Sequence, residues 1–136
     1  MACLFCAIAG GLEPAEIVYQ DEQAVAFLDH RPLFPGHVLL VPRRHIVTLA
    51  DLPESDTASF FETVKRLETA VERGMEADGS FIAINNIVSQ SVPHLHVHIV
   101  PRRRKDGLKG FFWPRLPYRD EAHLKETAEK IRAALG

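Results

Sequence analysis

The sequence predicts an α+β protein with an antiparallel sheet of about five strands, one long helix, a short N-terminal helix and a C-terminal helix. Short apolar runs typical of strands fall in two groups, on either side of one long stretch with helical periodicity. Residues 94–100 alternate strictly between histidine and apolar side chains, which is the pattern of a half-buried strand. Strands grouped around one long helix favour an α+β fold.

The first third of the chain contains four expected elements, which are a helix over residues 3–9 and strands over residues 17–19, 24–28 and 38–41. Gly10 and Gly11 end the helix, because glycine is common just past a helix C-terminus. A turn at Asp21 and Glu22 separates the first two strands. The third strand is a continuous apolar run that Pro42 closes.

A long helix is expected from about residue 53 to residue 78, with Asp51 near its start. Its apolar residues recur at the helical period, and they are Phe60, Phe61, Val64, Leu67, Val71 and Met75. Three elements follow, which are a strand over residues 81–85, a strand over residues 94–100 after a polar loop, and a helix over residues 121–135.

Length and composition indicate one ordinary globular domain over residues 1–136. Hydrophobic residues make up 46% and charged residues 25% of the chain, and a net charge of −2 argues against bulk binding of nucleic acid. The N-terminus lacks the basic start and long apolar run of a signal peptide, and no stretch could span a membrane. A cytoplasmic protein with no membrane partner is therefore expected. Cys3 and Cys6 would be reduced there, so their Cys-x-x-Cys spacing suggests metal or redox work.

Three histidines at two-residue spacing, His94, His96 and His98, are the main candidate functional residues. On a strand they would share one face while the apolar residues between them enter the core. Three interpretations follow, which are histidines on a solvent face, a metal site, and phosphoryl chemistry in which a neutral imidazole attacks phosphorus. A metal at the triad lacks support, because the sequence shows no carboxylate or further histidine aimed at that face.

Residues 94–100 resemble the signature of the histidine triad (HIT) superfamily at every position. Similar runs extend the resemblance over about residues 3–103, and they are residues 27–29, 31–32, 35–45 and 90–93. The resemblance implies the HIT-like fold, which has this α+β architecture and commonly forms homodimers that join two sheets. It also implies a nucleotide substrate, expected to be a purine nucleotide.

The resemblance assigns roles to four histidines. His96 matches the residue that attacks the α-phosphorus of a nucleotide and forms a nucleotidyl-imidazole, and the neutral imidazole is the attacking form. His98 matches the histidine toward the phosphates and leaving group, where a donor stabilises developing charge or supplies a proton. His94 matches the histidine that holds this arrangement from behind. His37 matches one that supports the triad by hydrogen bonding.

The resemblance also implies a substrate site. Asp29 matches the family acid that binds the ribose hydroxyls, since a carboxylate accepts two hydroxyl hydrogen bonds. The apolar slot for the base is expected to consist of Phe5, Ile8, Ile17 and Phe27. Gln90 and Ser91 match polar residues that contact phosphate oxygens or the leaving group, and Asn85 lies where relatives place an amide near the substrate. Residues 86–89 carry none of the glycines that many relatives have there.

Two cysteines alone do not make a zinc site, since structural zinc has four protein ligands. Some HIT proteins that begin with Cys-x-x-Cys complete a Cys₂His₂ site with the histidine after the Pro-Lys/Arg pair and the first triad histidine. The resemblance therefore implies a structural Zn²⁺ bound by Cys3, Cys6, His45 and His94. Such a site has no open position, so no catalytic metal is expected, and no organic cofactor.

Two segments after the triad have alternative interpretations. Residues 102–105 carry four cations that either attract a polyphosphate or form a solvated loop. The aromatic stretch Phe111-Phe112-Trp113 is similar to stretches in some bacterial HIT proteins, and would cover the site or join a dimer interface.

The sequence as a whole predicts a HIT-superfamily nucleotide hydrolase or transferase. It would cleave a nucleoside monophosphate from a dinucleoside polyphosphate or a nucleoside phosphoramidate through a covalent intermediate at His96. Two alternatives stay open, which are a nucleotide-binding interaction module without turnover and a phosphorylase that uses inorganic phosphate in place of water. An intact triad together with Asp29 argues against the first, because a pure binder needs no nucleophile.

Overall fold

The computed structural model describes residues 2–108 and 115–135 of the 136-residue chain. They belong to two compact units, residues 1–106 and residues 107–136. The first unit contains the sheet, and the second contains α3 (Glu121–Leu135), none of whose described residues is buried. The single domain expected over residues 1–136 stays a prediction. The stretch Phe111-Phe112-Trp113 lies outside the described residues.

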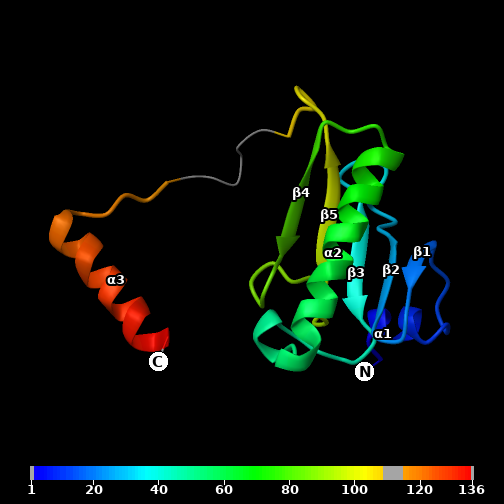
Figure 1. Cartoon of the computed structure of the whole chain (residues 1–136), viewed down its shortest axis with the longest axis horizontal. Helices are drawn as coiled ribbons and strands as arrows, with labels where there is room; N and C mark the ends of the chain where they lie inside the picture. Colours follow the sequence, from blue (N-terminus) through cyan, green and yellow to red (C-terminus); the bar gives the residue numbers. More distant parts are fainter. Residues whose placement is uncertain (1, 109–114, 136) are drawn as a thin grey trace. The chain divides into compact units, whose positions relative to one another are not determined.

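Five strands form one antiparallel sheet in the order β1-β2-β3-β5-β4 (Figure 1). Their bounds are Ile17–Gln20 for β1, Ala24–Leu28 for β2, Val38–Pro42 for β3, Gly79–Ile84 for β4 and Val97–Arg102 for β5. The last strand in the chain thus lies between β3 and β4, in the interior of the sheet. The predicted α+β fold with its five-stranded antiparallel sheet is confirmed.

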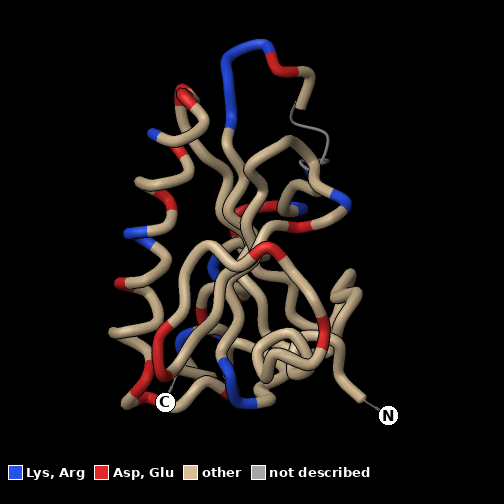
Figure 2. Tube along the Cα trace, turned by 90° about the vertical axis from the view of Figure 1, so that its right-hand side faces the viewer, with Lys and Arg blue, Asp and Glu red and all other residues tan. Residues whose placement is uncertain are grey.

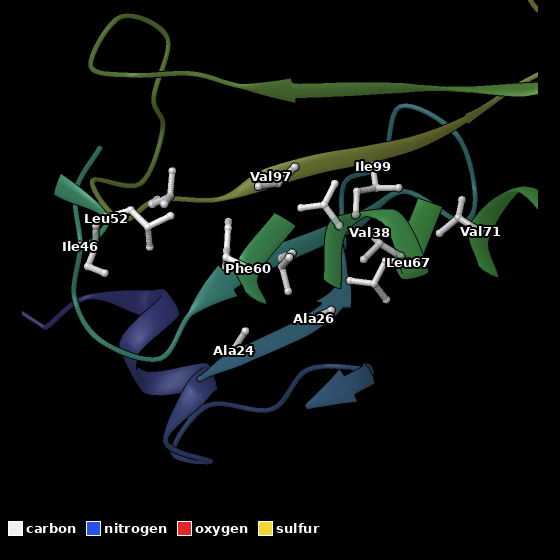
Figure 3. Close-up of a cluster of buried hydrophobic side chains, with 13 residues drawn as sticks. Ala24, Ala26, Val38, Ile46, Leu52, Phe60, Leu67, Val71, Val97 and Ile99 are labelled. Atoms are coloured by element: carbon white, nitrogen blue, oxygen red, sulfur yellow. The ribbon is translucent and has the colours of Figure 1, made fainter. Parts of the chain in front are cut away.

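The long helix α2 (Glu54–Gly74) packs on one face of the sheet and forms the main core with it (Figure 3). Alternate residues of three strands point to this face, and they are Ala24, Ala26, Val38, Leu40, Val97 and Ile99. They meet an apolar stripe of the helix that consists of Phe60, Val64, Leu67 and Val71. The helical period had predicted each residue of this stripe.

A second apolar cluster lies on the opposite face, where the short helix α1 (Leu4–Ala9) packs. It consists of Phe5, Ile8, Val25, Phe27, Leu39 and Val41. Strands β2 and β3 are therefore buried on both faces, which explains their continuous apolar runs. Because side chains alternate along β5 and the residue before it, His98 and His96 turn to this second face, away from α2.

The triad strand is shorter at its start than predicted, because β5 begins three residues after His94. Its neighbour β3 ends at Pro42, which has no N–H with which to continue the ladder. Two other contacts hold the preceding segment. The Leu95 N–H donates to the Ile46 carbonyl at 2.6 Å, and the His94 ring donates to the Pro42 carbonyl at 2.8 Å. Side chains continue to alternate between the two faces before the strand begins, since Leu95 belongs to the core under α2.

Helix α2 is also shorter than predicted and ends at Gly74 instead of residue 78. Glu76 follows with a φ of 52°, a left-handed conformation that stops the helix. Asp51 lies outside α2, in a short 3₁₀ turn (Leu49–Asp51) where its carboxylate accepts the N–H and O–H of Thr48. No helix within the described ranges is both long and apolar enough to cross a membrane.

Candidate active site and metal centre

One row of side chains crosses the α1 face of the sheet and organises the candidate active site. The register places Phe27 opposite Leu39, and Leu39 opposite His98, so these side chains lie next to one another. Asp29 and His37 extend the hairpin beyond β2 and β3, through a hydrogen bond of 2.9 Å from the Asp29 N–H to the His37 carbonyl. Sheet pairing therefore brings together polar side chains that are far apart in the sequence.

A cavity of about 1010 Å³ lies over this row. Its apolar wall includes Leu4, Phe5, Ile8, Phe27 and Leu39, and its polar lining includes Asp29, Ser91, His96 and His98. The volume is at the upper end of those of small-molecule sites. An apolar wall beside acceptors and imidazoles suits a ligand with a flat apolar part, hydroxyls and an anionic part.

Most of the predicted site residues line this cavity, namely Phe5, Ile8, Phe27, Asp29, Ser91, His96 and His98. His37 and His94 are buried directly behind the lining residues that they contact. Ile17 lies on the edge strand β1 with 39% of its surface exposed, outside the lining. Asn85 and Gln90 also lie outside the described lining of the cavity. The structure thus does not bring Ile17, Asn85 and Gln90 to the site.

Backbone contacts orient the buried His96 ring. Its Nδ1 lies 2.7 Å from the carbonyl oxygen of His94, so Nδ1 carries the proton and donates it. The lone pair is then on Nε2, the nitrogen on the other side of the ring. Phe5 packs edge-on against this ring with 5.0 Å between the centroids, and His96 is 3% exposed. Packing and one hydrogen bond therefore hold the ring with Nε2 available.

A second hydrogen-bond chain determines which nitrogen of His98 carries a proton. The Leu33 N–H donates to Nδ1 of His37 at 3.1 Å, so neutral His37 carries its proton on Nε2. That Nε2 lies 3.0 Å from Nδ1 of His98 and donates to it, which leaves the His98 proton on Nε2. Burial, His96 and His37 lower the pKa of His98 to about 4, and burial also lowers the pKa of His37. Neutral His98 is thus a hydrogen-bond donor at neutral pH.

Asp29 joins this chain. One carboxylate oxygen accepts the Arg31 N–H at 2.9 Å, and the other lies 3.8 Å from Nε2 of His37. The side chains of Asp29, His37 and His98 offer ligand atoms within 4.8 Å of one another. The expectation that no carboxylate or further histidine faces the triad is therefore wrong. It failed because the pairing of Asp29 with His37 depends on the hairpin, which the spacing of the residues does not reveal.

The stability of the protein should depend on His98 between about pH 4 and 6.5. The pKa of His98 is about 4 in the folded chain, against an ordinary value of 6.5. Within this window the unfolded chain binds a proton that the folded chain does not, so the free energy of unfolding falls as the pH falls. His98→Gln should reduce the slope of the unfolding free energy with pH, by the contribution of at most about one proton. Urea unfolding of both proteins at several pH values measures the two slopes, and equal slopes would contradict the prediction.

The loop before the triad has an unusual backbone. Ile87 and Ser89 have φ angles of 68° and 64°, in the left-handed region that glycine adopts without cost and other residues rarely adopt. The side chain of Gln90 holds this conformation, since it accepts the Ile87 N–H at 3.1 Å and donates to the Val47 carbonyl at 2.6 Å. Gln90 therefore shapes the loop that presents Ser91 to the cavity.

The four predicted metal ligands lie together beside α1. Cys3 Sγ is 3.4 Å from Nδ1 of His94, and Cys6 Sγ is 3.3 Å from Nδ1 of His45 and 3.5 Å from Nδ1 of His94. With Zn–S bonds of about 2.3 Å and Zn–N bonds of about 2.0 Å, a tetrahedral site separates sulfur from nitrogen by about 3.5 Å. Two thiols and two imidazoles at these separations fit Zn²⁺.

The protonation of these groups also fits a metal. His94 donates its Nε2 proton to the Pro42 carbonyl, so its Nδ1 presents a lone pair to the two sulfurs. Burial, and then the neighbouring Cys3, raise the pKa of the Cys6 thiol. A thiolate at Cys6 is therefore stable at neutral pH only beside a cation such as a bound metal ion. His94 is thus a candidate metal ligand through its ring and the partner of His96 through its carbonyl.

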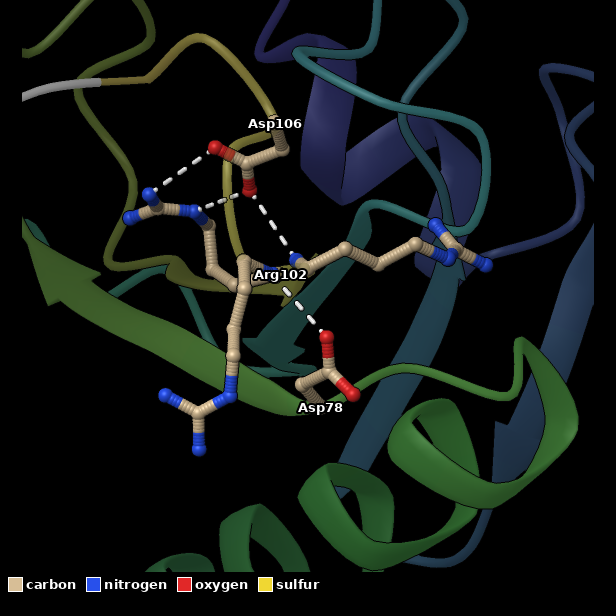
Figure 4. A network of polar contacts seen from close by, with 5 residues as sticks. Asp78, Arg102 and Asp106 are labelled. Carbon is tan, nitrogen blue, oxygen red and sulfur yellow. Dashed lines mark hydrogen bonds and ion pairs between the residues drawn. The ribbon is translucent and has the colours of Figure 1, made fainter.

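The cations of residues 102–105 lie at the end of β5 and in the loop after it (Figure 2). Arg102 donates to both oxygens of Asp106 at 2.6 and 3.0 Å, and the Arg104 N–H donates to Asp78 at 2.9 Å (Figure 4). The Arg103 guanidinium donates to the Met75 carbonyl. This segment is outside the described lining of the cavity, and the two interpretations of its cations, attraction of a polyphosphate and a solvated loop, stay predictions.

Several lining residues were not singled out from the sequence, and they include Leu4, Glu13, Glu16, His30 and Arg31. His30 and Arg31 directly follow Asp29, so proximity to a candidate residue was the available signal. Glu13 and Glu16 precede β1 and gave no signal, because only the folded chain brings them to α1 and β2.

Comparison with known proteins identifies the family. Residues 11–105 match the HIT domain family, which is well over half of the chain. The chain belongs to the HIT family.

Its HIT relatives include both uncharacterized proteins and nucleotide hydrolases. An uncharacterized HIT-like protein of Mycobacterium tuberculosis is 39% identical over an alignment of 140 positions, which covers 99% of this chain and 94% of that protein. The adenosine 5′-monophosphoramidase of Schizosaccharomyces pombe is 30% identical, and the match covers 99% of this chain and 99% of that protein. The asymmetrical bis(5′-nucleosyl)-tetraphosphatase of the same yeast is 36% identical, over 68% of this chain and 52% of that protein.

Solved HIT structures have the same fold. A HIT family protein from Bacillus subtilis is 30% identical with a TM-score of 0.90, over 100% of this chain and 99% of that chain. A Zn-bound histidine triad family protein from Mycobacterium smegmatis is 38% identical with a TM-score of 0.74, over 98% of each chain.

Proposed function

We propose that this HIT-family protein is a nucleotide hydrolase or transferase that forms a covalent nucleotidyl intermediate on His96. Its substrate would be a dinucleoside polyphosphate or a nucleoside phosphoramidate, the classes named for its characterized relatives. The observation that supports the proposal is the His96 ring, whose Nδ1 donates to a backbone carbonyl and whose Nε2 therefore keeps its lone pair, beside a cavity of the size of a small-molecule site.

The proposed reaction has two displacements at phosphorus. Nε2 of His96 attacks the α-phosphorus, an N–P bond forms, and the bond to the leaving group breaks with its electron pair on that group. The positive charge that the ring acquires is stabilised by the His94 carbonyl, which accepts the Nδ1 proton at 2.7 Å. Water then attacks phosphorus and loses a proton to the solvent, the N–P bond breaks with its electron pair returning to Nε2, and the nucleoside monophosphate is released. Each displacement is easier than direct hydrolysis.

His98 and Ser91 would stabilise the charge that develops. With its pKa lowered to about 4, His98 offers an Nε2–H hydrogen bond rather than the proton of an imidazolium. Ser91 lines the same cavity with a hydroxyl that both donates and accepts. Neither residue would transfer a proton in this step, so both would act by hydrogen bonding.

A substrate panel tests this proposal. Purified protein should turn over at least one member of a panel of dinucleoside polyphosphates and adenosine phosphoramidate. A strong dependence of product release on inorganic phosphate would identify a phosphorylase. Tight nucleotide binding without turnover of any member would favour the interaction module. Activity that a chelator of weakly bound metals abolishes would favour a metal at Asp29, His37 and His98.

We also propose that the Cys₂His₂ cluster holds a structural Zn²⁺, that the protein acts in the cytoplasm and that it forms a homodimer. The fit of the four donor atoms supports the metal, and a Zn-bound relative adds to that support. The zinc would fix α1 to the segment before β5. Since α1 carries Phe5 and Ile8, the metal would hold the apolar wall of the cavity in place.

Asp29 should give the enzyme a preference for ribonucleotides over 2′-deoxyribonucleotides. One of its oxygens accepts the Arg31 N–H, and the other lies 3.8 Å from Nε2 of His37, beyond hydrogen-bond distance, so this second oxygen can accept from the ribose. Loss of the 2′ hydroxyl leaves this acceptor partly unpaired, which costs about 1–3 kcal/mol, or roughly tenfold to a hundredfold. Asp29→Ala should erase most of this discrimination, whereas Asp29→Asn retains an acceptor and part of it.

The measurement is the ratio of kcat/KM for matched ribo and deoxy substrates in the three proteins. If that ratio is the same in the wild type and in Asp29→Ala, Asp29 does not read the sugar.

A further inference from the structure

Two carboxylates line the cavity, and their backbones contact different elements of the fold. The N–H of Glu13 donates to the Ala7 carbonyl of α1 at 3.2 Å, so Glu13 lies beside the helix that forms the apolar wall. The carbonyl of Glu16 accepts the Leu28 N–H at 3.0 Å, one residue before the proposed ribose acid. Glu13 is therefore at the end expected for the base, and Glu16 is at the end expected for the sugar.

Neither carboxylate has a side-chain hydrogen bond or an ion pair within the described residues. An ionised carboxylate has two acceptor oxygens and no donor, so it pairs only with groups that carry protons. A base that enters the apolar wall loses water from its faces, and its polar edge then needs partners. On this wall, which includes Leu4, Phe5 and Ile8, the carboxylate of Glu13 is the charged group beside α1.

The two purines differ at the edge that meets such a carboxylate. Guanine presents N1–H and the N2 amino group side by side, which match two carboxylate oxygens. Adenine presents one amino group beside the N1 acceptor, and that acceptor would face an anion. Hypoxanthine presents N1–H alone. A carboxylate thus strengthens the binding of guanine through hydrogen bonds and weakens the binding of adenine through repulsion of its N1 lone pair.

We infer that Glu13 accepts hydrogen bonds from the Watson–Crick edge of the bound base and that the site prefers guanine nucleotides to adenine nucleotides. This inference rests on the proposed function, because it concerns the base of the same nucleotide. Glu13 is exposed at the rim, so water competes for it. The preference is therefore about tenfold, at the lower end for a hydrogen bond to a charged group.

Calorimetric titration of the full-length, zinc-loaded protein with GMP, IMP and AMP measures the preference. GMP should bind most tightly, IMP next and AMP about tenfold more weakly than GMP. In Glu13→Gln the side chain offers one acceptor and one amide donor, which match the N6 amino group and N1 of adenine. That variant should bind GMP more weakly and AMP more tightly than the wild type, so that the preference disappears or reverses.

Glu16→Gln is the matched control, since it removes the same charge at the sugar end of the cavity. It should keep the GMP to AMP ratio of the wild type. Equal binding of GMP and AMP to the wild type, or a ratio that Glu13→Gln leaves unchanged, would overturn the inference and leave the proposed function standing. Failure of all three nucleotides to bind would overturn both.

Discussion

Replacing His96 by Ala or Gly should lower kcat/KM by several orders of magnitude and leave the fold and most of the nucleotide affinity intact. The reason is that Nε2 of His96 would form the covalent bond, and the neighbouring imidazole of His98 cannot replace it. The Nδ1 of His98 accepts from His37, so its Nε2 carries a proton and has no lone pair for attack. Loss of a nucleophile from a covalent mechanism has typically cost factors of about 10⁴ to 10⁶. Steady-state kinetics on the best substrate measures the loss.

A direct readout accompanies the kinetics. Rapid acid-free quenching of the wild type during turnover should yield protein whose mass is increased by one nucleoside monophosphate, and His96→Ala should yield none. His123→Ala, on α3, is the matched control for a histidine-to-alanine change and should retain the wild-type rate. Retention of more than about a tenth of the activity in His96→Ala would be incompatible with His96 as the nucleophile.

The sheet was predictable because local patterns determine it. Val38 to Val41 are buried on both faces and read as a continuous apolar run, whereas the strand of the triad alternates because only one of its faces meets α2. The two faces of β2 also follow from alternation, with Ala26 under α2 and Phe27 under α1. The element bounds were less predictable. The start of β5 depends on where its neighbour β3 ends, and a helical period alone does not show that α2 stops at Gly74.

The residues of the candidate site that belong to sequence motifs were predictable. Those that contacts between distant segments bring to the site were not. The resemblance placed His96, His98 and Asp29 together, and all three line one cavity. It also placed Gln90 at the phosphates, whereas the structure uses that side chain to hold Ile87 in a left-handed conformation. The glycines missing from residues 86–89 were the available signal, because a loop without them needs another means of support. Nothing in the sequence marked Glu13, whose position depends on a backbone contact with α1.

Cys3→Ala should lower the melting temperature by about 10 °C or more, and purified wild-type protein should contain about one zinc per chain. The four donors lie at zinc-like separations in the folded chain and come from three distant segments, so metal binding is coupled to folding. Loss of one ligand that costs about 3 kcal/mol corresponds to roughly 10 °C for a chain of this size. Metal analysis and thermal unfolding measure the two quantities.

The chelator response separates lost metal from lost packing of Cys3. A strong chelator should lower the melting temperature of the wild type toward that of Cys3→Ala and should have little further effect on the variant. The same treatment should weaken nucleotide binding, because α1 carries Phe5 against the His96 ring and the His94 carbonyl holds the Nδ1 proton of that ring. Zinc-free protein after gentle purification, or equal chelator shifts in both proteins, would count decisively against a zinc site at Cys3, Cys6, His45 and His94.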